Sequence, residues 1–370
     1  TRQTGDNLPQ SGMTIGVGLA PWDANNTFDG ILNHNFDPEI NRLIDFCDSR
    51  QKYNQTVYLR LGYEFENIWT PGYYDYDKYK QVWIYIHNLF AQATHVKNVK
   101  FVWQASCSPS GYTDYLAYLK GVNTSIDWTP SDPTIYTNWY PGSDYVDIVG
   151  ISYFQRVDDK SQRAITEFSS FNGNNYTIFS QRELSDKMLT IAKNHGKPVM
   201  ICEAAPRAYH TKNETYSNAH LWWDGPIYDT WDDDPDKRKK AGTVTKTGTQ
   251  IWEEFYQPLF NYMELHKDVI RYFNYINQDW TKDDQWTWTT EHMYWGDTRI
   301  QENDFLMTKW QNEMAKSKWI HGKSLDGPST FTVKETGNTE NIEFGFVSNV
   351  SPEIAIYRFT ITENGTINHN

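Results

Sequence analysis

The feature that most constrains how this chain folds is a regular alternation between short apolar runs and longer amphipathic runs. The strand-like runs cover residues 13–20, 56–64, 99–106, 146–153, 198–203 and 270–276. The helix-like runs cover residues 38–50, 75–93, 113–120, 180–195, 250–267 and 302–319. Strands that alternate with helices predict parallel βα units. Several of these strands are apolar on both sides, as strands covered by helices should be. The expected fold class is therefore α/β.

Two regions interrupt this alternation. Residues 211–246 form a long polar stretch, which predicts an excursion on the surface. After residue 321, three short stretches alternate like antiparallel strands, at 330–334, 341–347 and 353–362. A chain of 370 residues can hold one large domain or two. We expect a main domain at residues 1–321, and at 322–370 a β-rich appendage or the start of a further domain.

Composition excludes several classes of protein. The chain has 47 acidic and 34 basic residues and a formal net charge of -13, whereas a general nucleic-acid binder should be basic. Its apolar runs are too short to cross a bilayer. Cys47, Cys107 and Cys202 are too few for a disulfide framework and lack the paired spacing of a zinc site. We therefore predict no metal, no cofactor, no nucleic-acid partner and no membrane partner.

Two glutamates stand at the ends of strand-like runs. Read with period two, residues 56–66 place Arg60 and Glu64 on the face opposite the apolar side chains. Glu203 ends the apolar run 198–203, where a buried carboxylate costs free energy unless it is paired. Either glutamate alone is often only a helix cap or a salt-bridge partner. Together, three strands apart, they match the two carboxyl groups that glycoside hydrolysis commonly uses.

A family resemblance rests on the same stretches. Arg60-Leu-Gly-Tyr-Glu64, followed by Asn67 and Trp69, is similar to the Arg-x-x-His-Glu of glycoside hydrolase family 26, a β-mannanase-like family of the clan A retaining enzymes. That family also contains lichenases and β-1,3-xylanases. The family's fifth to eighth strands resemble the stretches at 98–103, 140–150, 197–203 and 270–280. The resemblance covers residues 14–320.

The resemblance implies a (β/α)8 TIM barrel with Glu64 as acid/base after strand four and Glu203 as nucleophile at strand seven. It also implies that Arg60 lies near Glu203, and that Tyr153 is the tyrosine that hydrogen-bonds the nucleophile. Glu66 shares the parity of Glu64 and is its rival as acid/base, although it lies farther into the loop.

The chain departs from the family pattern in two respects. Tyr63 stands where the family has a histidine before the acid/base. The strand count also starts late, because the run at 56–64 corresponds to strand four and the run at 13–20 to strand three. The first two βα units are therefore not visible in the chain. Either an N-terminal portion precedes it, or another segment closes the barrel, since an open barrel would expose strand edges.

Aromatic residues supply further candidates for sugar binding. Of the 16 tryptophans, several lie in polar, loop-like stretches, where flat rings suit the apolar faces of sugars. For any single tryptophan, structural packing is the more common role. The predicted substrate-binding set comprises Arg60, Tyr63, Asn67, Trp69, Trp103, Tyr153, Trp222, Trp280 and Trp295, and Trp22 is a candidate for an outer subsite.

Asn-X-Ser/Thr sequons indicate an extracellular, N-glycosylated protein, because they act as acceptors only in secreted chains. They begin at Asn25, Asn54, Asn123, Asn175, Asn213, Asn349 and Asn364.

The leading interpretation is a secreted, endo-acting, retaining glycoside hydrolase of a polysaccharide of the mannan, β-glucan or xylan type. Net negative charge favours a neutral substrate. One alternative is a catalytically quiet carbohydrate-binding or structural protein, with extracellular assembly through the C-terminal strands. A hydrolase of sulfated or fucosylated algal glycans is a third.

Overall fold

The computed structural model describes residues 11–19, 24–66, 73, 75–107, 135–154, 180–217, 243–280, 296–319, 356–361 and 367–369. Its centre is a parallel sheet in which six strands follow one another in chain order. These strands are β1 (Ser11–Gly18), β2 (Gln55–Leu61), β3 (Val99–Ala105), β4 (Ile148–Tyr153), β5 (Val199–Ala204) and β9 (Ile270–Phe273). Each of the six predicted parallel strands is present, with small shifts at its ends.

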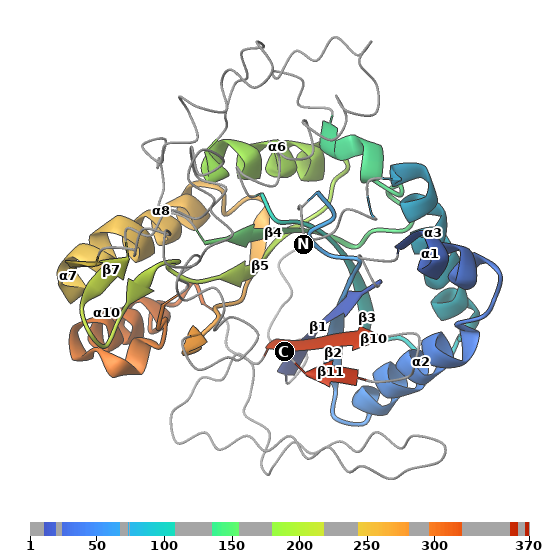
Figure 1. Ribbon diagram of the computed structural model, residues 1–370, viewed down its shortest axis with the longest axis horizontal. Helices are drawn as coiled ribbons and strands as arrows, with labels where there is room; N and C mark the ends of the chain where they lie inside the picture. Colours follow the sequence, from blue (N-terminus) through green and yellow to red (C-terminus); the bar gives the residue numbers. More distant parts are fainter. Residues whose placement is uncertain are drawn as a thin grey trace, which may run out of the picture.

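Helices surround this sheet on its outer side (Figure 1). They are α1 (Ala24–Leu32), α2 (Asp37–Gln51), α3 (Tyr76–Gln92), α6 (Gln181–Asn194), α7 (Gly248–Ile251), α8 (Gln257–Leu265) and α10 (Asp304–Met314). Short 3-10 turns lie at η4 (Ile135–Trp139) and η10 (Ile300–Glu302). Helix α6 begins at a capping box, in which Ser180 and Glu183 satisfy each other's backbone N–H groups.

The structure differs from the predicted helices in two places. Helix α1 was not predicted. The predicted helix at 250–267 is divided by a π-helical turn, η8 (Trp252–Tyr256), and Pro258, which has no N–H to donate, lies in the first turn of the helix that follows. The predicted helix at 113–120 lies outside the described residues.

The sheet curls until its last strand contacts its first two across the interior. Asn274, just after β9, donates from Nδ2 to Thr14 Oγ1 on β1 at 3.0 Å. The rings of Tyr58 on β2 and Tyr272 on β9 lie 5.2 Å apart. The apolar part of the interior consists of Val102, Ile148, Met200 and Cys202. A curled parallel sheet of this kind fits part of a (β/α)8 barrel, which confirms the predicted fold class in this coarser form.

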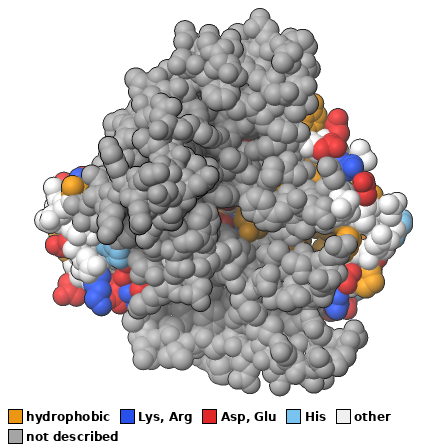
Figure 2. Space-filling model, viewed as in Figure 1, with side chains coloured by type: hydrophobic (Ala, Val, Ile, Leu, Met, Phe, Trp, Pro, Cys, Tyr) orange, Lys and Arg blue, Asp and Glu red, His pale blue; other side chains and the backbone are white. Residues whose placement is uncertain are grey.

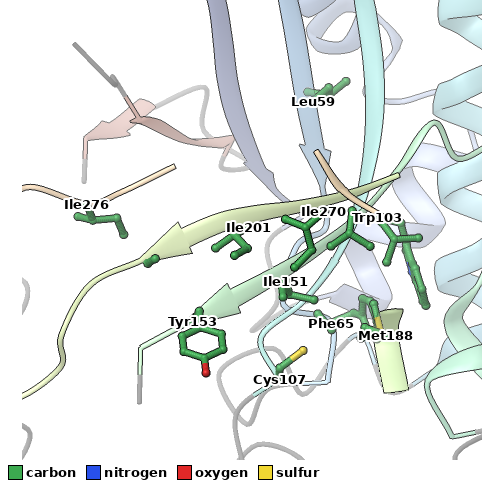
Figure 3. Close-up of a cluster of buried hydrophobic side chains, with 14 of the residues drawn as sticks. Leu59, Phe65, Trp103, Cys107, Ile151, Tyr153, Met188, Ile201, Ile270 and Ile276 are labelled. Carbon is green, nitrogen blue, oxygen red and sulfur yellow. The ribbon is translucent and has the colours of Figure 1, made fainter. Parts of the chain in front are cut away.

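The larger core lies between the sheet and the helices. Outward-facing strand residues such as Leu59, Ile151 and Ile201 meet helix residues such as Met188 there (Figure 3). All four side chains are fully buried. Burying apolar area at about 25 cal/mol per Å² supplies most of the stabilisation of such a domain. The same strands therefore leave their other face for the interior and its polar groups.

The C-terminal segment joins the barrel sheet. Strand β10 (Ile356–Ile361) pairs in parallel with β1, with Thr14 opposite Ile356, and β11 (Ile367–His369) pairs antiparallel with β10. The predicted appendage is therefore not confirmed, because β10 adds a strand beside β1. The domain boundary after residue 321 stays a prediction, and the expected strands at 330–334 and 341–347 lie outside the described residues.

A small antiparallel sheet is formed by strands at the two ends of the polar stretch predicted at 211–246. It consists of β6 (Tyr209–His210), β7 (Thr215–Ser217) and β8 (Thr243–Thr245).

On the face seen in Figure 2, acidic and basic side chains are intermixed at both flanks. Among the described helices, none is both long and apolar enough to span a membrane.

Gly150 provides a test of how tightly the interior is packed. A Cβ at this position would lie 2.7 Å from Cys202 Sγ and 2.8 Å from Gln104 Cβ. Gly150→Ala should therefore lower the free energy of unfolding by about 1–3 kcal/mol, as overpacking does. Urea unfolding measures the loss. Combining it with Cys202→Ala should restore part of the stability, whereas strictly additive losses would contradict the contact.

Candidate active site

A buried ion pair lies at the centre of the candidate site. Arg60 on β2 and Glu203 on β5 form it through Nη1 and Oε1, and the two side chains are 0% and 4% exposed. Burying either charge alone would cost several kcal/mol, so each requires the other. Burial alone would lower the pKa of Arg60, but the opposing negative charge of Glu203 outweighs it, so the pKa of Arg60 is raised and the guanidinium keeps its proton. The sequence prediction that these two residues lie together agrees with this geometry.

A β-bulge directs Glu203 into the interior. Between β4 and β5, Ile151 pairs with Ile201 but Ser152 pairs with Glu203, so Cys202 is an extra residue. A bulge of this kind lets two successive side chains share one face. Cys202 packs in the interior apolar cluster, and Glu203 reaches Arg60 beside it. Strict alternation along β5 would have pointed Glu203 towards the helices.

A hydrogen-bonded path connects Arg60 with Glu64. Arg60 Nη1 donates to Gln104 Oε1 at 3.0 Å, and Gln104 Nε2 donates to Ser152 Oγ at 2.9 Å. Ser152 Oγ in turn donates to Glu64 Oε1 at 2.7 Å. Gln104 and Ser152 are both fully buried. Glu64 is partly exposed. The two carboxylates are thus linked through one guanidinium, across four neighbouring strands.

Sequence analysis missed Gln104 and Ser152. Both are polar residues inside strand-like apolar runs, and both share the inward face with Arg60. Applying the period-two reading to the runs at 99–106 and 146–153 would have found them.

The backbone at Glu64 adopts a left-handed conformation, with φ of 54°. Two backbone hydrogen bonds hold this turn. The Glu64 N–H donates to the Gln104 carbonyl at 2.9 Å, and the Gly62 N–H donates to the Val17 carbonyl at 2.8 Å. Left-handed non-glycine residues cluster at functional sites, where the surrounding structure maintains them. The Tyr63 ring lies against the Arg60 guanidinium at 4.9 Å, where the family has a histidine.

Glu66, the rival acid/base, has a structural role, because it holds the end of β3. Its fully buried carboxylate accepts hydrogen bonds from the Ser106 N–H, the Ser106 hydroxyl and the Cys107 N–H, at 2.8–3.1 Å. Burial raises the pKa of Glu66, although these hydrogen bonds oppose the shift. Glu66 therefore fastens the loop after β2 to the end of β3, and the more exposed Glu64 remains the candidate acid/base.

Two predicted site residues point away from the interior. Tyr153 (Figure 3) was expected to contact Glu203, but it follows the inward-facing Ser152. Its ring packs 5.7 Å from that of Tyr262 on α8. Trp103, expected in the sugar platform, is fully buried and stacks on Phe65 at 4.8 Å. Both corrections have one cause: adjacent residues of a strand face opposite sides, and these two belong to the helix-facing core.

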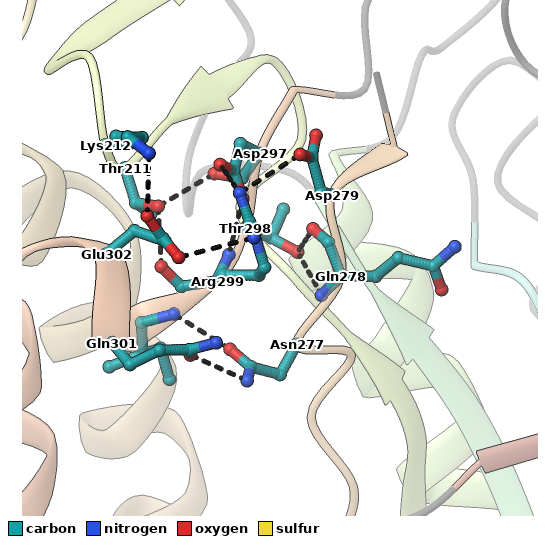
Figure 4. Close-up of polar contacts among 11 residues, drawn as sticks. Thr211, Lys212, Asn277, Gln278, Asp279, Asp297, Thr298, Arg299, Gln301 and Glu302 are labelled. Atoms are coloured by element: carbon teal, nitrogen blue, oxygen red, sulfur yellow. Dashed lines mark hydrogen bonds and ion pairs between the residues drawn. The ribbon is translucent and has the colours of Figure 1, made fainter. Parts of the chain in front are cut away.

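Trp280 lies in the loop after β9 and is 9% exposed. Its backbone neighbour Asp279 belongs to an ion-pair cluster centred on Arg299 (Figure 4). Arg299 bonds Asp279 at 3.0 Å and Asp297 at 2.7 Å, and it also pairs with Glu302 at 3.3 Å. This cluster ties Asp279, which directly precedes Trp280, to residues 297–302.

Several other predicted residues fall outside the part of the chain that the structure describes. Asn67, Trp22, Trp69, Trp222 and Trp295 lie outside the described residues. The sequon residues Asn54 and Asn213 are exposed, and Asn25 lies within α1. The remaining sequon residues, Asn123, Asn175, Asn349 and Asn364, lie outside the described residues.

The arrangement suits two-carboxylate chemistry. An ionised carboxylate paired with a guanidinium suits a nucleophile, and a partly exposed carboxylate with a hydroxyl donor can exchange protons. Among the described residues, no group of three or more histidine, cysteine or acidic side chains is placed to hold a metal ion.

Comparisons with known proteins point to the same chemistry. The model of glycosyl hydrolase family 26 matches residues 110–181. A β-1,3-xylanase from a Vibrio species is 26% identical over 90% of this chain and 58% of its own length. A β-1,3-xylanase from an Alcaligenes species is 27% identical over 85% of this chain and 53% of its own length. The chain thus spans a little over half the length of these curated relatives. The predicted resemblance to a glycoside hydrolase of the family 26 type is confirmed.

Solved structures with partial similarity include a double mutant of a Cellulomonas fimi endo-β-1,4-mannanase, at a TM-score of 0.44 and 10% identity. The match covers 79% of this chain and 49% of that one. A family 26 β-mannanase from Bacteroides ovatus has a TM-score of 0.39 and 15% identity, over 75% of this chain and 56% of that one.

The Arg299 cluster yields a stability prediction. Arg299→Ala leaves two nearly buried carboxylates without their cation and should cost on the order of 3 kcal/mol of unfolding free energy. Arg42→Ala is the matched control, because Arg42 and Glu39 form an exposed pair on α2, which contributes less than about 1 kcal/mol. Denaturant unfolding of both variants measures the difference. Equal losses would show that the Arg299 cluster contributes no more than an isolated surface pair.

Proposed function

We propose that the protein is an extracellular, endo-acting, retaining hydrolase of a neutral β-glycan, and that β-1,3-xylan is its substrate. The observation that carries the proposal is the buried Arg60–Glu203 pair, which hydrogen bonds through Gln104 and Ser152 connect to Glu64. Both curated relatives that span most of the chain are β-1,3-xylanases. The net charge of -13 supports a neutral rather than a polyanionic glycan.

The proposed reaction has two displacements. Glu203 attacks the anomeric carbon while Glu64 gives its proton to the departing glycosidic oxygen, which leaves a glycosyl ester on Glu203. Water then attacks the same carbon as Glu64 takes its proton, and the ester bond to Glu203 breaks. Arg60 keeps Glu203 ionised before the first step, because the guanidinium stabilises the negative charge in a site from which water is excluded.

The nucleophile assignment predicts that Glu203→Gln abolishes hydrolysis of β-1,3-xylan. Reducing-end assays on a panel of β-1,3-xylan, β-mannan and β-glucan measure the rate, with Glu39→Gln, a partly exposed residue of α2, as the control. Wild-type rates in Glu203→Gln would contradict the assignment. Because the substitution leaves Arg60 buried with a weaker partner, the variant could unfold. Labelling the wild-type protein with a 2-deoxy-2-fluoro xyloside covers that case, and mass spectrometry should find the sugar on Glu203.

The acid/base assignment predicts a dependence on the leaving group. Glu64→Gln should slow hydrolysis of β-1,3-xylan by about 10²–10⁴-fold, the usual contribution of general acid catalysis. With an aryl xyloside whose phenol is strongly acidic, the first step needs no proton and should keep its burst of released phenol. Equal slowing of both substrates would contradict the role of Glu64. Binding without turnover by the wild type would support the carbohydrate-binding alternative instead.

A further inference from the structure

The polar path from Arg60 to Glu64 has a fixed direction. A guanidinium carries only hydrogen-bond donors, so Gln104 must present its oxygen to Arg60 Nη1. The amide nitrogen of Gln104 then faces Ser152 Oγ and donates to it at 2.9 Å. If the amide were turned over, two donors would meet at Arg60, and the Gln104 oxygen and Glu64 would compete for the single hydrogen of Ser152. Arg60 therefore determines the orientation of the Gln104 amide.

The direction of hydrogen-bond donation continues from Ser152 to Glu64. A serine hydroxyl has one hydrogen, and since Gln104 already donates to Ser152, that hydrogen points to Glu64 Oε1 at 2.7 Å. Gln104 and Ser152 are fully buried. In surroundings of low dielectric, such a chain polarises its members and each bond is stronger than in water.

We propose that Gln104 and Ser152 are positioning residues that make Glu64 carry its transferable proton on Oε2. A protonated carboxyl has one hydroxyl oxygen and one carbonyl oxygen, and the carbonyl oxygen is the one that accepts from Ser152. The same hydroxyl also stabilises Glu64 when it is ionised. The inference rests on the proposed function, since it concerns which oxygen of the acid/base faces the glycosidic bond.

Other titratable groups near Glu64 do not mask a change in the titration of its carboxyl group. Burial raises the pKa of Cys107 well above its usual value, and it raises the pKa of Cys202 to about 12. Both thiols remain neutral while the carboxyl titrates. Arg60 and Glu203 form the charged end of the path itself, and Glu66 is held by Ser106 and Cys107. A change confined to the Ser152 hydroxyl therefore reports on Glu64.

The central test is Ser152→Ala, which removes the donor and little volume. The midpoint of the Glu64 carboxyl titration, followed by 13C NMR and assigned with Glu64→Gln, should rise by about one pH unit, because the ionised form loses a hydrogen bond to a charged group. Ser152→Thr keeps the hydroxyl and should restore the wild-type midpoint. Ser185→Ala, a buried serine on α6, is the matched control and should leave the midpoint unchanged.

Kinetics provide the second readout. The alkaline limb of kcat/KM for β-1,3-xylan follows deprotonation of the acid, so it should move to higher pH in Ser152→Ala. The value of kcat should fall for β-1,3-xylan but not for the aryl xyloside with an acidic phenol, because only the first needs a well-placed proton. An unchanged titration, or equal loss on both substrates, would overturn the inference. Failure of the proposed function is distinct: the wild type would then not hydrolyse any glycan of the panel.

Discussion

The structure depends most on one interaction, the burial of the Arg60 guanidinium inside the curled sheet. A charge without exposure to water is tolerated only where other groups replace its hydration. Glu203 supplies the opposite charge and Gln104 supplies a neutral acceptor. Space for the guanidinium comes from Gly16 on β1, where a Cβ would lie 2.8 Å from Arg60 Nη2. Strands β1, β2, β3 and β5 must therefore take their relative positions for this side chain to fit and for its Nη1 to reach both acceptors.

The rest of the site follows from this requirement. The β-bulge at Cys202 is what brings Glu203 to Arg60, and the path through Gln104 and Ser152 extends the influence of the same guanidinium to Glu64. Glu66 and two backbone hydrogen bonds hold the turn on which Glu64 sits. The apolar core between sheet and helices supplies the rigidity, while the interior carries the polar groups. Stability and the proposed chemistry thus use opposite faces of the same strands.

Much of this could be predicted from the sequence because the relevant signals are local. Apolar runs that alternate with amphipathic ones located the six parallel strands, and the ends of two runs gave Glu64 and Glu203. The differences arise where strand parity turns a side chain towards the helices, or where a pairing depends on distant parts of the chain. Tyr153 and Trp103 have rings suited to a sugar site, but strand parity sends them to the helix-facing core. The pairing of β10 with β1 joins segments more than 300 residues apart, and period-two patterning cannot reveal its partner.

The central claim is that Glu203 and Glu64 act as a nucleophile and an acid/base in a double displacement. The stereochemistry of the first product formed tests it most directly, by 1H NMR of the anomeric signals during hydrolysis of a β-1,3-xylooligosaccharide. A double displacement releases the β-anomer first, and the α-anomer appears only later, through mutarotation. Initial release of the α-anomer would contradict it, because inversion requires a water between more widely separated carboxyl groups.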